Sequence, residues 1–362
     1  MIEHSLTEYP RLLIVLTSFK DVPIRPDAAD YFKRLFFSKE DFLQPGNSVK
    51  TNSVATYYEQ VSGGRVSITG DIFGPYVLPQ TVGYYCQDGH GKDNKAGDPK
   101  NPNTQTMACH ALDALLKDKP DIDLGRYDNQ TRPGFVDGLI VVHAGEGGEL
   151  HVTEPTKYIW SVQWVMKDQR FVGKSNTGVY NFLTLPEDAR MGVCAHELGH
   201  LVFQWPDLYR TKPDRGVGRW CVMSGGAWNA IKGTQEGDVP CHPSAWLKIQ
   251  QGWVEVRNVK GSLKNVLLNE IKGTTTTKGG GVMSSAPNPK GFNGVYRLWA
   301  NGDENGKEFF LIENRMKYGA FDQSLGGDGL LSKFHLCEPC LQSNTLQFFL
   351  SSFFFLVIRF QR

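Results

Sequence analysis

The stretch His196-Glu197-Leu198-Gly199-His200, followed by Asp207, says most about the fold and chemistry of this 362-residue chain. On an α-helix, residues four apart lie above each other on one face, so His196 and His200 can direct their imidazoles at one Zn²⁺. Glu197 then lies beside the metal, where it can take a proton from a zinc-bound water and pass it to a leaving amine. The spacing predicts peptide-bond hydrolysis with Glu197 as general base; the alternative is a surface helix that carries these residues by chance.

The residues around this motif indicate a helix with a buried face. Apolar residues follow helical spacing at Met191, Cys194, Leu198, Leu201 and Val202. Pro186, followed by Glu187 and Asp188, is typical of a first helical turn. We therefore expect the motif helix to begin near Pro186.

A zinc enzyme needs a third protein ligand and an open position for water. Asp207 is the nearest carboxylate after the motif, and Pro206 disfavours helical backbone at Trp205. The helix should therefore end there, so that the chain can turn back and deliver Asp207 to the metal. The alternative is an exposed aspartate that ends the helix and leaves the zinc site impaired.

At these residues the sequence resembles the immune-inhibitor-A type of metallopeptidase, whose pattern reads His-Glu-x-Gly-His-x-x-Gly-x-Pro-Asp-x-Tyr. The chain matches this pattern in the motif itself and in Pro206-Asp207-Leu208-Tyr209. Further matches are collinear with the family, at residues 57–64, 136–145, 219–228, 242–248, 252–253 and 310–315. The segment 219–228 looks like the family's methionine turn, which would make Met223 part of a hydrophobic floor beneath the metal.

The resemblance spans roughly residues 11 to 331 and implies a zinc-dependent endopeptidase of metzincin-like fold that acts on protein or peptide substrates. It also implies that His196, His200 and Asp207 bind Zn²⁺, and that the protein is secreted. The sequence starts only ten residues before the first expected core strand, so we expect no signal segment or propeptide in the chain as it stands.

One departure from the family pattern concerns the third ligand. The family places five residues between the second histidine and the aspartate, the third of them glycine, whereas here six intervene and Phe203 occupies the glycine position. A left-handed turn is sterically costly at a phenylalanine. Either the helix runs one residue longer before it turns, or Asp207 misses the metal and the chain is a catalytically impaired, protease-like binding protein. We favour ligation because Pro206, Leu208 and Tyr209 keep the family context.

Composition fits a folded enzyme and narrows the choice of partners. Hydrophobic residues make up 40% of the chain, enough for one large core or two smaller ones. A net charge of +1 gives no sign of nucleic-acid or anionic-membrane binding. We expect a monomer whose partners are its substrates.

The periodicity predicts an α+β fold. Strands are expected at 11–19, 65–69 and 138–143, and helices at 53–61 and 107–116. Later strands are expected at 254–256 and 266–268, then an exposed connection at 274–291 and a hairpin formed by 295–300 and 308–315. We predict a zincin-like catalytic domain over residues 1–254, with a mixed sheet and the motif helix, and a β-rich region over 255–331.

Residues 332–362 form an atypical Phe-rich tail that repeats no family element. We expect it to be disordered or to derive from translated non-coding sequence, while a membrane-associating segment is the alternative. The apolar run 346–358 is shorter than the roughly 20 residues that a membrane-spanning helix needs.

Two minor features could also bind metal. Asp88, Asp93, Asn94 and Asp98 could supply oxygens to a structural Ca²⁺, although a solvated acidic loop is the favoured alternative. Among seven cysteines, Cys194 lies on the motif helix, where we expect a small buried side chain and no ligand.

Overall fold

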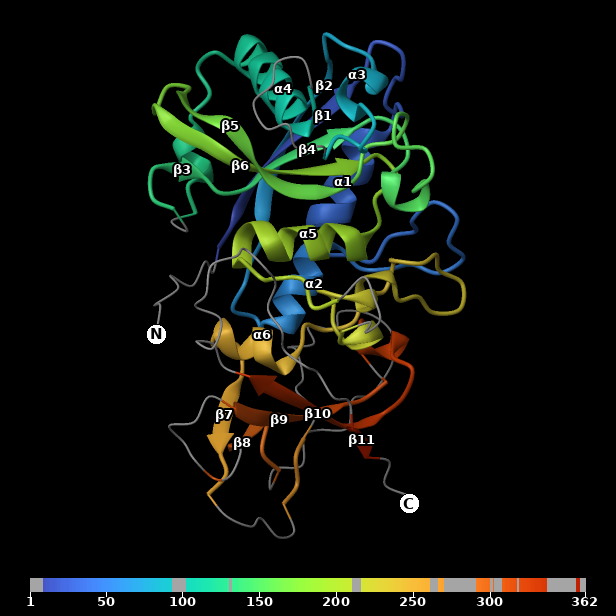
Figure 1. Ribbon diagram of the computed structural model, residues 1–362, viewed down its shortest axis with the longest axis vertical. Helices are drawn as coiled ribbons and strands as arrows, with labels where there is room; N and C mark the ends of the chain where they lie inside the picture. The colour runs from blue at the N-terminus through green and yellow to red at the C-terminus, as the bar shows by residue number, and fades with distance from the viewer. Residues whose placement is uncertain are drawn as a thin grey trace. The chain divides into compact units, whose positions relative to one another are not determined.

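The computed structural model describes residues 9–92, 102–129, 132–209, 216–260, 266–269, 291–299, 302, 308–317, 319–336 and 356–358 (Figure 1). The chain contains both helices and strands, and the strands form two mixed sheets, which confirms the α+β class. The chain divides into two compact units, residues 1–59 with 66–206 and residues 60–65 with 207–362.

The first unit is built on a mixed six-stranded sheet. Its strands follow the order β2-β1-β4-β6-β3, and β5 pairs with β6 outside this path. β5 and β6 form an antiparallel hairpin, whereas the other neighbours run parallel. The strands are β1 (Arg11–Ser18), β2 (Thr69–Val77), β3 (Phe135–Val136), β4 (Leu139–His143), β5 (Val162–Val172) and β6 (Thr177–Pro186).

Helices cover both faces of this sheet, with α4 and α5 on opposite faces (Figure 1). The central strands β1 and β4 are buried along almost their whole length, as parallel strands between two helical layers must be. The core therefore lies around β1 and β4, and α5 packs against β5 and β6. The helices are α1 (Ala28–Phe37), α2 (Val54–Val61), α3 (Val82–Cys86), α4 (Thr104–Asp118) and α5 (Met191–Phe203).

The second unit combines one short helix with a five-stranded sheet of order β11-β10-β9-β8-β7. β7 and β8 are parallel, and the other pairs are antiparallel. Its small core joins Ala245 of the helix to Val295, Phe309 and Leu311 of the sheet. The elements are α6 (Ala245–Gln250), β7 (Glu255–Asn258), β8 (Gly294–Trp299), β9 (Glu308–Arg315), β10 (Gly329–Leu336) and β11 (Leu356–Ile358).

Most predicted elements are present, with shifted ends. The predictions at 11–19, 53–61, 107–116, 138–143 and 254–256 correspond to β1, α2, α4, β4 and β7, and the predicted hairpin is β8 with β9. The strand predicted at 65–69 is wrong: β2 starts only at Thr69, because its ladder partner β1 starts at Arg11, opposite Thr69. Of the strand predicted at 266–268, the described residues show one bridge, Leu268 to Phe292.

Several predictions fall wholly or largely outside the described residues. These are the connection 274–291, the calcium oxygens of Asp93, Asn94 and Asp98, and most of the tail 332–362. The domain division at residues 254 and 331 stays a prediction. In the described part of the chain, no helix is both long enough and apolar enough to cross a membrane.

Candidate metal centre

The two histidines of the motif face each other from successive turns of α5. Their Nε2 atoms lie 3.2 Å apart, and their ring planes are nearly perpendicular, at 85°. Two nitrogens that each bind a tetrahedral Zn²⁺ at 2.0–2.1 Å lie about 3.3 Å from each other. The separation of His196 and His200 therefore fits a shared zinc ion.

The second ring nitrogen of His200 has a backbone partner. Its Nδ1 lies 2.5 Å from the carbonyl oxygen of Trp205, which can only accept a hydrogen bond. Nδ1 therefore carries the proton and donates it, which leaves the Nε2 lone pair directed at His196 Nε2 and at any metal there. This contact also fixes the plane of the His200 ring.

Asp207 completes the group that the sequence predicts. One ligand atom from each of His196, His200 and Asp207 lies within 4.8 Å of the other two. Both histidines are partly exposed and Asp207 is exposed, so a metal and a substrate could reach them. Within the described residues, no other cluster of His, Cys, Asp or Glu has such geometry. Metal binding by these three residues stays a prediction.

The turn after α5 accommodates the extra residue before Asp207. The helix continues through Phe203, which occupies the position of the family's glycine, and Gln204 adopts the left-handed conformation with φ 54° and ψ 33°. Trp205 N then donates to Gly199 O at 3.1 Å. The helix thus runs one residue longer before it turns, as in the first of the two alternatives that the sequence left open.

An aromatic cluster explains why a phenylalanine is tolerated at this helix end. The Phe203 ring lies 4.9 Å from the ring of Tyr58 and 5.2 Å from that of Trp205. Tyr58 also donates its hydroxyl proton to Ala195 O at 2.5 Å, one residue before His196. Sequence reasoning gave Tyr58 no role, although it belongs to a segment that matches the family.

Glu197 lies on the buried side of the motif helix and is 8% exposed. Its neighbour Cys194 is fully buried; burial, and secondly the charge of Glu197, raise the pKa of that thiol far above its ordinary value. Cys194 therefore stays a protonated thiol at neutral pH and is no metal ligand. No disulfide joins the five described cysteines.

The start of α5 differs from the prediction. Pro186 is the last residue of β6, and the helix begins only at Met191, so the predicted first turn at Pro186 is wrong. The reason is that the next two carboxylates bind backbone elsewhere. Glu187 accepts from Gly145 N at 2.8 Å and from Arg25 N at 2.6 Å, and Asp188 accepts from Gly147 N at 3.2 Å.

The residue after Asp207 is fixed by the predicted methionine-turn segment. Leu208 N donates to Met223 O at 2.7 Å, and Leu208 O accepts from Val217 N at 2.9 Å. The segment itself turns at Cys221, whose carbonyl oxygen accepts from Ser224 N and Gly226 N. The role of Met223 as a floor beneath the metal stays a prediction.

Known proteins share this part of the chain. A family model described as "Immune inhibitor A peptidase M6, catalytic domain" matches residues 25–254. The "Pre-pro-metalloprotease PrtV" of Vibrio cholerae serotype O1 is 30% identical over 254 residues, which cover 60% of this chain and 25% of that protein. "Immune inhibitor A" of Bacillus thuringiensis subsp. alesti is 29% identical over 234 residues, or 57% of this chain and 33% of that protein. The match thus spans a quarter to a third of these relatives.

Proposed function

Because the chain belongs to the immune inhibitor A peptidase family M6, we propose that it is a zinc-dependent endopeptidase that hydrolyses peptide bonds in protein substrates. Family membership supports peptidase activity, and the Vibrio relative, a metalloprotease by name, supports metal dependence. The observation that carries the proposal is the convergence of His196, His200 and Asp207 within 4.8 Å.

The donor set suits zinc. Two imidazole nitrogens and one carboxylate oxygen are ligands that Zn²⁺ accepts at catalytic sites, and three protein ligands leave a fourth position open. When bound, zinc would polarise the substrate carbonyl and lower the pKa of water to roughly 7. The Trp205 carbonyl would keep His200 in the tautomer that leaves Nε2 for the metal.

Glu197 would move the proton. It directly follows His196 on α5, and its side chain is largely shielded from bulk water. A shielded carboxylate beside the attacking water can accept its proton and then donate that proton to the leaving amine. His196 and His200 are engaged with the metal in this proposal, so Glu197 is the general base and acid of the reaction.

The test combines metal content with cleavage. Purified protein should hold about one zinc per chain and cleave a denatured protein, and a chelator should stop the cleavage. Glu197→Gln should lower kcat by roughly 10²–10⁴-fold, the usual contribution of a general base, while zinc content stays unchanged. Glu154→Gln is the matched control, because Glu154 is an exposed partner of Lys157 in the same unit. Full activity of Glu197→Gln would refute the assignment.

The runner-up is a catalytically impaired, protease-like binding protein. It draws on the extra residue between His200 and Asp207 and on the replacement of the family's glycine by Phe203. Stoichiometric zinc in a folded protein that cleaves no substrate, including unfolded casein and short peptides, would favour it over the peptidase.

The remaining expectations follow from the peptidase proposal. We expect protein or peptide substrates, a monomer, and secretion, and no nucleic-acid or membrane partner. The low net charge of +1 supports substrate selection by local pockets over bulk electrostatic attraction.

A further inference from the structure

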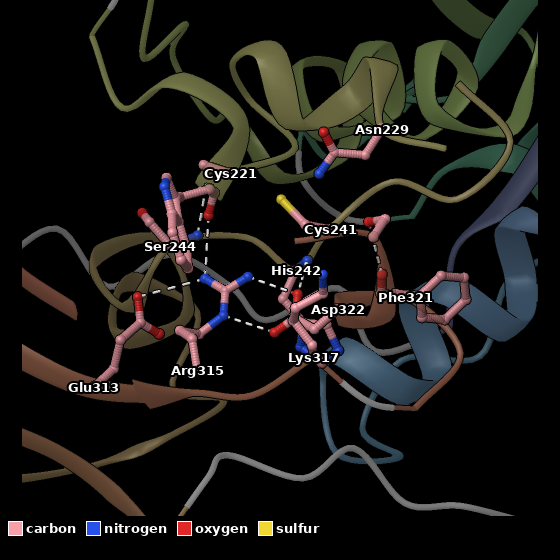
Figure 2. A network of polar contacts seen from close by, with 12 residues as sticks. Cys221, Asn229, Cys241, His242, Ser244, Glu313, Arg315, Lys317, Phe321 and Asp322 are labelled. Carbon is pink, nitrogen blue, oxygen red and sulfur yellow. Dashed lines mark hydrogen bonds and ion pairs between the residues drawn. The ribbon is translucent and has the colours of Figure 1, made fainter. Parts of the chain in front are cut away.

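The second unit contains a buried arginine that is not among the proposed metal ligands or the general base. Arg315, the last residue of β9, has a side chain that is 2% exposed (Figure 2). Its Nε donates to Asp322 Oδ2 and its Nη2 to Asp322 Oδ1, both at 2.6 Å. A bidentate contact of this kind offsets the desolvation of a buried guanidinium and fixes its orientation.

The third nitrogen of Arg315 contacts the segment that carries Met223. Nη1 donates to Trp220 O at 3.1 Å and lies 3.6 Å from Glu313 Oε1. Trp220 immediately precedes Cys221, where the chain turns toward Met223. The guanidinium therefore holds the backbone at the start of this turn.

Asp322 and Glu313 extend the network to the start of α6 and the residues just before it. Asp322 Oδ1 accepts from His242 N at 2.9 Å, and Glu313 Oε1 accepts from Ala245 N at 3.2 Å. Burial alone would raise the pKa of Asp322, but the charge and hydrogen bonds of Arg315, together with the charges of His242 and Lys248, outweigh burial and hold that pKa below its usual range. The network therefore keeps its charges at neutral and mildly acidic pH.

A continuous path of contacts leads from Arg315 to the third metal ligand, within the second unit. Arg315 fixes Trp220, the turn at Cys221 leads to Met223, and Met223 O accepts from Leu208 N at 2.7 Å. Leu208 is the residue after Asp207. A shift of the 220–223 segment would therefore displace the backbone that presents the Asp207 carboxylate.

We propose that Arg315, held by Asp322, is a positioning residue for the metal centre, because it fixes the segment that anchors Asp207. This inference rests on the proposed zinc site and goes beyond it by naming the element that sets the third ligand. A purely structural arginine would change the stability of the protein and leave its zinc affinity unchanged. The two roles can therefore be separated by measurement.

The test measures zinc affinity and folding in the same variant. Arg315→Lys keeps the positive charge but loses the bidentate contact, so the zinc dissociation constant, measured by competition with a chromogenic chelator, should rise about 10-fold or more. The circular dichroism of the zinc-free protein should stay unchanged. Arg257→Lys is the control, because Arg257 is exposed and its ion pair with Glu255 is a long one, at 3.5 Å, that should contribute little. Unchanged zinc affinity in folded Arg315→Lys overturns the proposal.

A double-mutant cycle shows whether Arg315 acts through Asp207. In an Asp207→Ala background, Arg315→Lys should cause no further loss of zinc affinity, because the ligand that it positions is already absent. If the two losses add in full, Arg315 does not act through Asp207 and the proposal fails.

A second variant covers the case in which Arg315→Lys does not fold. Asp322→Asn keeps the side-chain volume and one acceptor oxygen but removes the negative charge that binds the Arg315 guanidinium. Like Arg315→Lys, it should raise the zinc dissociation constant. Wild-type affinity in folded Asp322→Asn overturns the positioning role. Failure of the zinc site itself looks different, because the wild-type chain would then bind no zinc, or Asp207→Ala would bind it as tightly as the wild type.

Discussion

His200 uses both nitrogens of its ring, one toward His196 and one toward the Trp205 carbonyl. The second contact comes from the residue that follows the left-handed turn, so the turn that delivers Asp207 also orients a histidine. The two features cannot vary independently, because any change in the turn moves the Trp205 carbonyl and the Asp207 backbone together. The turn at position 204 therefore links the orientation of His200 to the backbone that leads to Asp207.

Asp207 gives the most direct residue-scale prediction. Asp207→Ala removes the third ligand, so zinc affinity should fall by more than the 10–100-fold typical of changes outside the ligand shell. Chelator competition on the purified variant measures this, with Asp121→Ala, an exposed aspartate of the first unit, as control. An unchanged dissociation constant would mean that zinc, if bound, is held without Asp207.

Asp188 predicts a pH dependence of stability. Burial, and secondly the charge of Glu146, raise the pKa of Asp188 to about 6 from its ordinary value of 3.8. The folded state therefore binds this proton more tightly than the unfolded state. Its contribution to stability is present below pH 4 and disappears as the pH rises through 6.

Asp188→Asn should remove this dependence and keep the acceptor for Gly147 N. At pH 7 the variant should be more stable, by up to about 3 kcal/mol if the whole shift is recovered. Thermal unfolding between pH 4 and 8 measures the effect, with Asp121→Asn as control. Parallel pH profiles of the variant and the wild type would contradict the prediction.

At the residue scale, the sequence predicts His196, Glu197, His200 and Asp207 as site residues because ligand chemistry depends on residue type and spacing, and the structure brings His196, His200 and Asp207 together. Contacts made by backbone were invisible to it. His200 is oriented by the backbone carbonyl of Trp205, and every residue type has such a carbonyl, so residue identity does not predict this contact. The local sequence predicts a helix start at Glu187 and Asp188, because it does not contain their long-range partners Gly145 and Gly147.

The element that matters most to the site is α5 with its final turn. Gln204 is one of few described residues other than glycine with positive φ. A side chain in this conformation costs about 1 kcal/mol relative to glycine. The packing of Phe203 on Tyr58 and Trp205 offsets that strain.

Gln204→Gly should therefore stabilise the protein by about 0.5–1 kcal/mol, because glycine adopts the left-handed conformation without strain. Zinc affinity should stay unchanged, since the turn keeps its shape. Chemical denaturation measures the gain, and Gln251→Gly, whose φ is negative, is a control that should lose stability. A loss of stability in Gln204→Gly would show that the side chain has contacts that outweigh the strain.

At the element scale, prediction succeeded where periodicity is strong and local. The apolar runs of β1 and β4 and the helical repeat of α4 gave clear signals. The hairpin of β5 and β6 was not predicted, because its mixture of polar and apolar residues follows neither period over its full length. The sequence allows two alternatives for the end of α5, because the choice between them depends on the tertiary packing of Phe203.

At the scale of the whole molecule, each unit supplies its own support for the site residues. In the first, Tyr58 donates to Ala195 within α5, and the carboxylates of Glu187 and Asp188 bind backbone just before the helix starts. In the second, the network around Arg315 holds the segment that anchors Leu208. The sequence predicts the α+β class but not this support, because these hydrogen bonds to backbone, such as Arg315 with Trp220 and Tyr58 with Ala195, join residues that are far apart in the chain.

Zinc removal should lower the stability of the whole protein. A metal that binds only the folded state contributes RT ln(1 + [Zn]/Kd), or about 2.7 kcal/mol when free zinc is 100 times Kd. Chelation should therefore lower Tm, and added zinc should restore it. Glu197→Gln should respond like the wild type, because Glu197 is not one of the three proposed ligands. Calorimetry with and without chelator measures this. If Tm is the same with and without zinc in every variant, the metal does not contribute to the stability of the fold.

The left-handed turn at Gln204 also affects how relatives of this chain can be recognised. A search template that fixes a gap of five residues between the second histidine and the aspartate would pass over any homologue that gained one residue there. Here the helix is longer by one residue and the bend lies one residue later, and a ligand atom of Asp207 still lies within 4.8 Å of those of both histidines. Templates with a variable gap, anchored on the proline and aspartate, should therefore recover divergent members that rigid spacing rules discard.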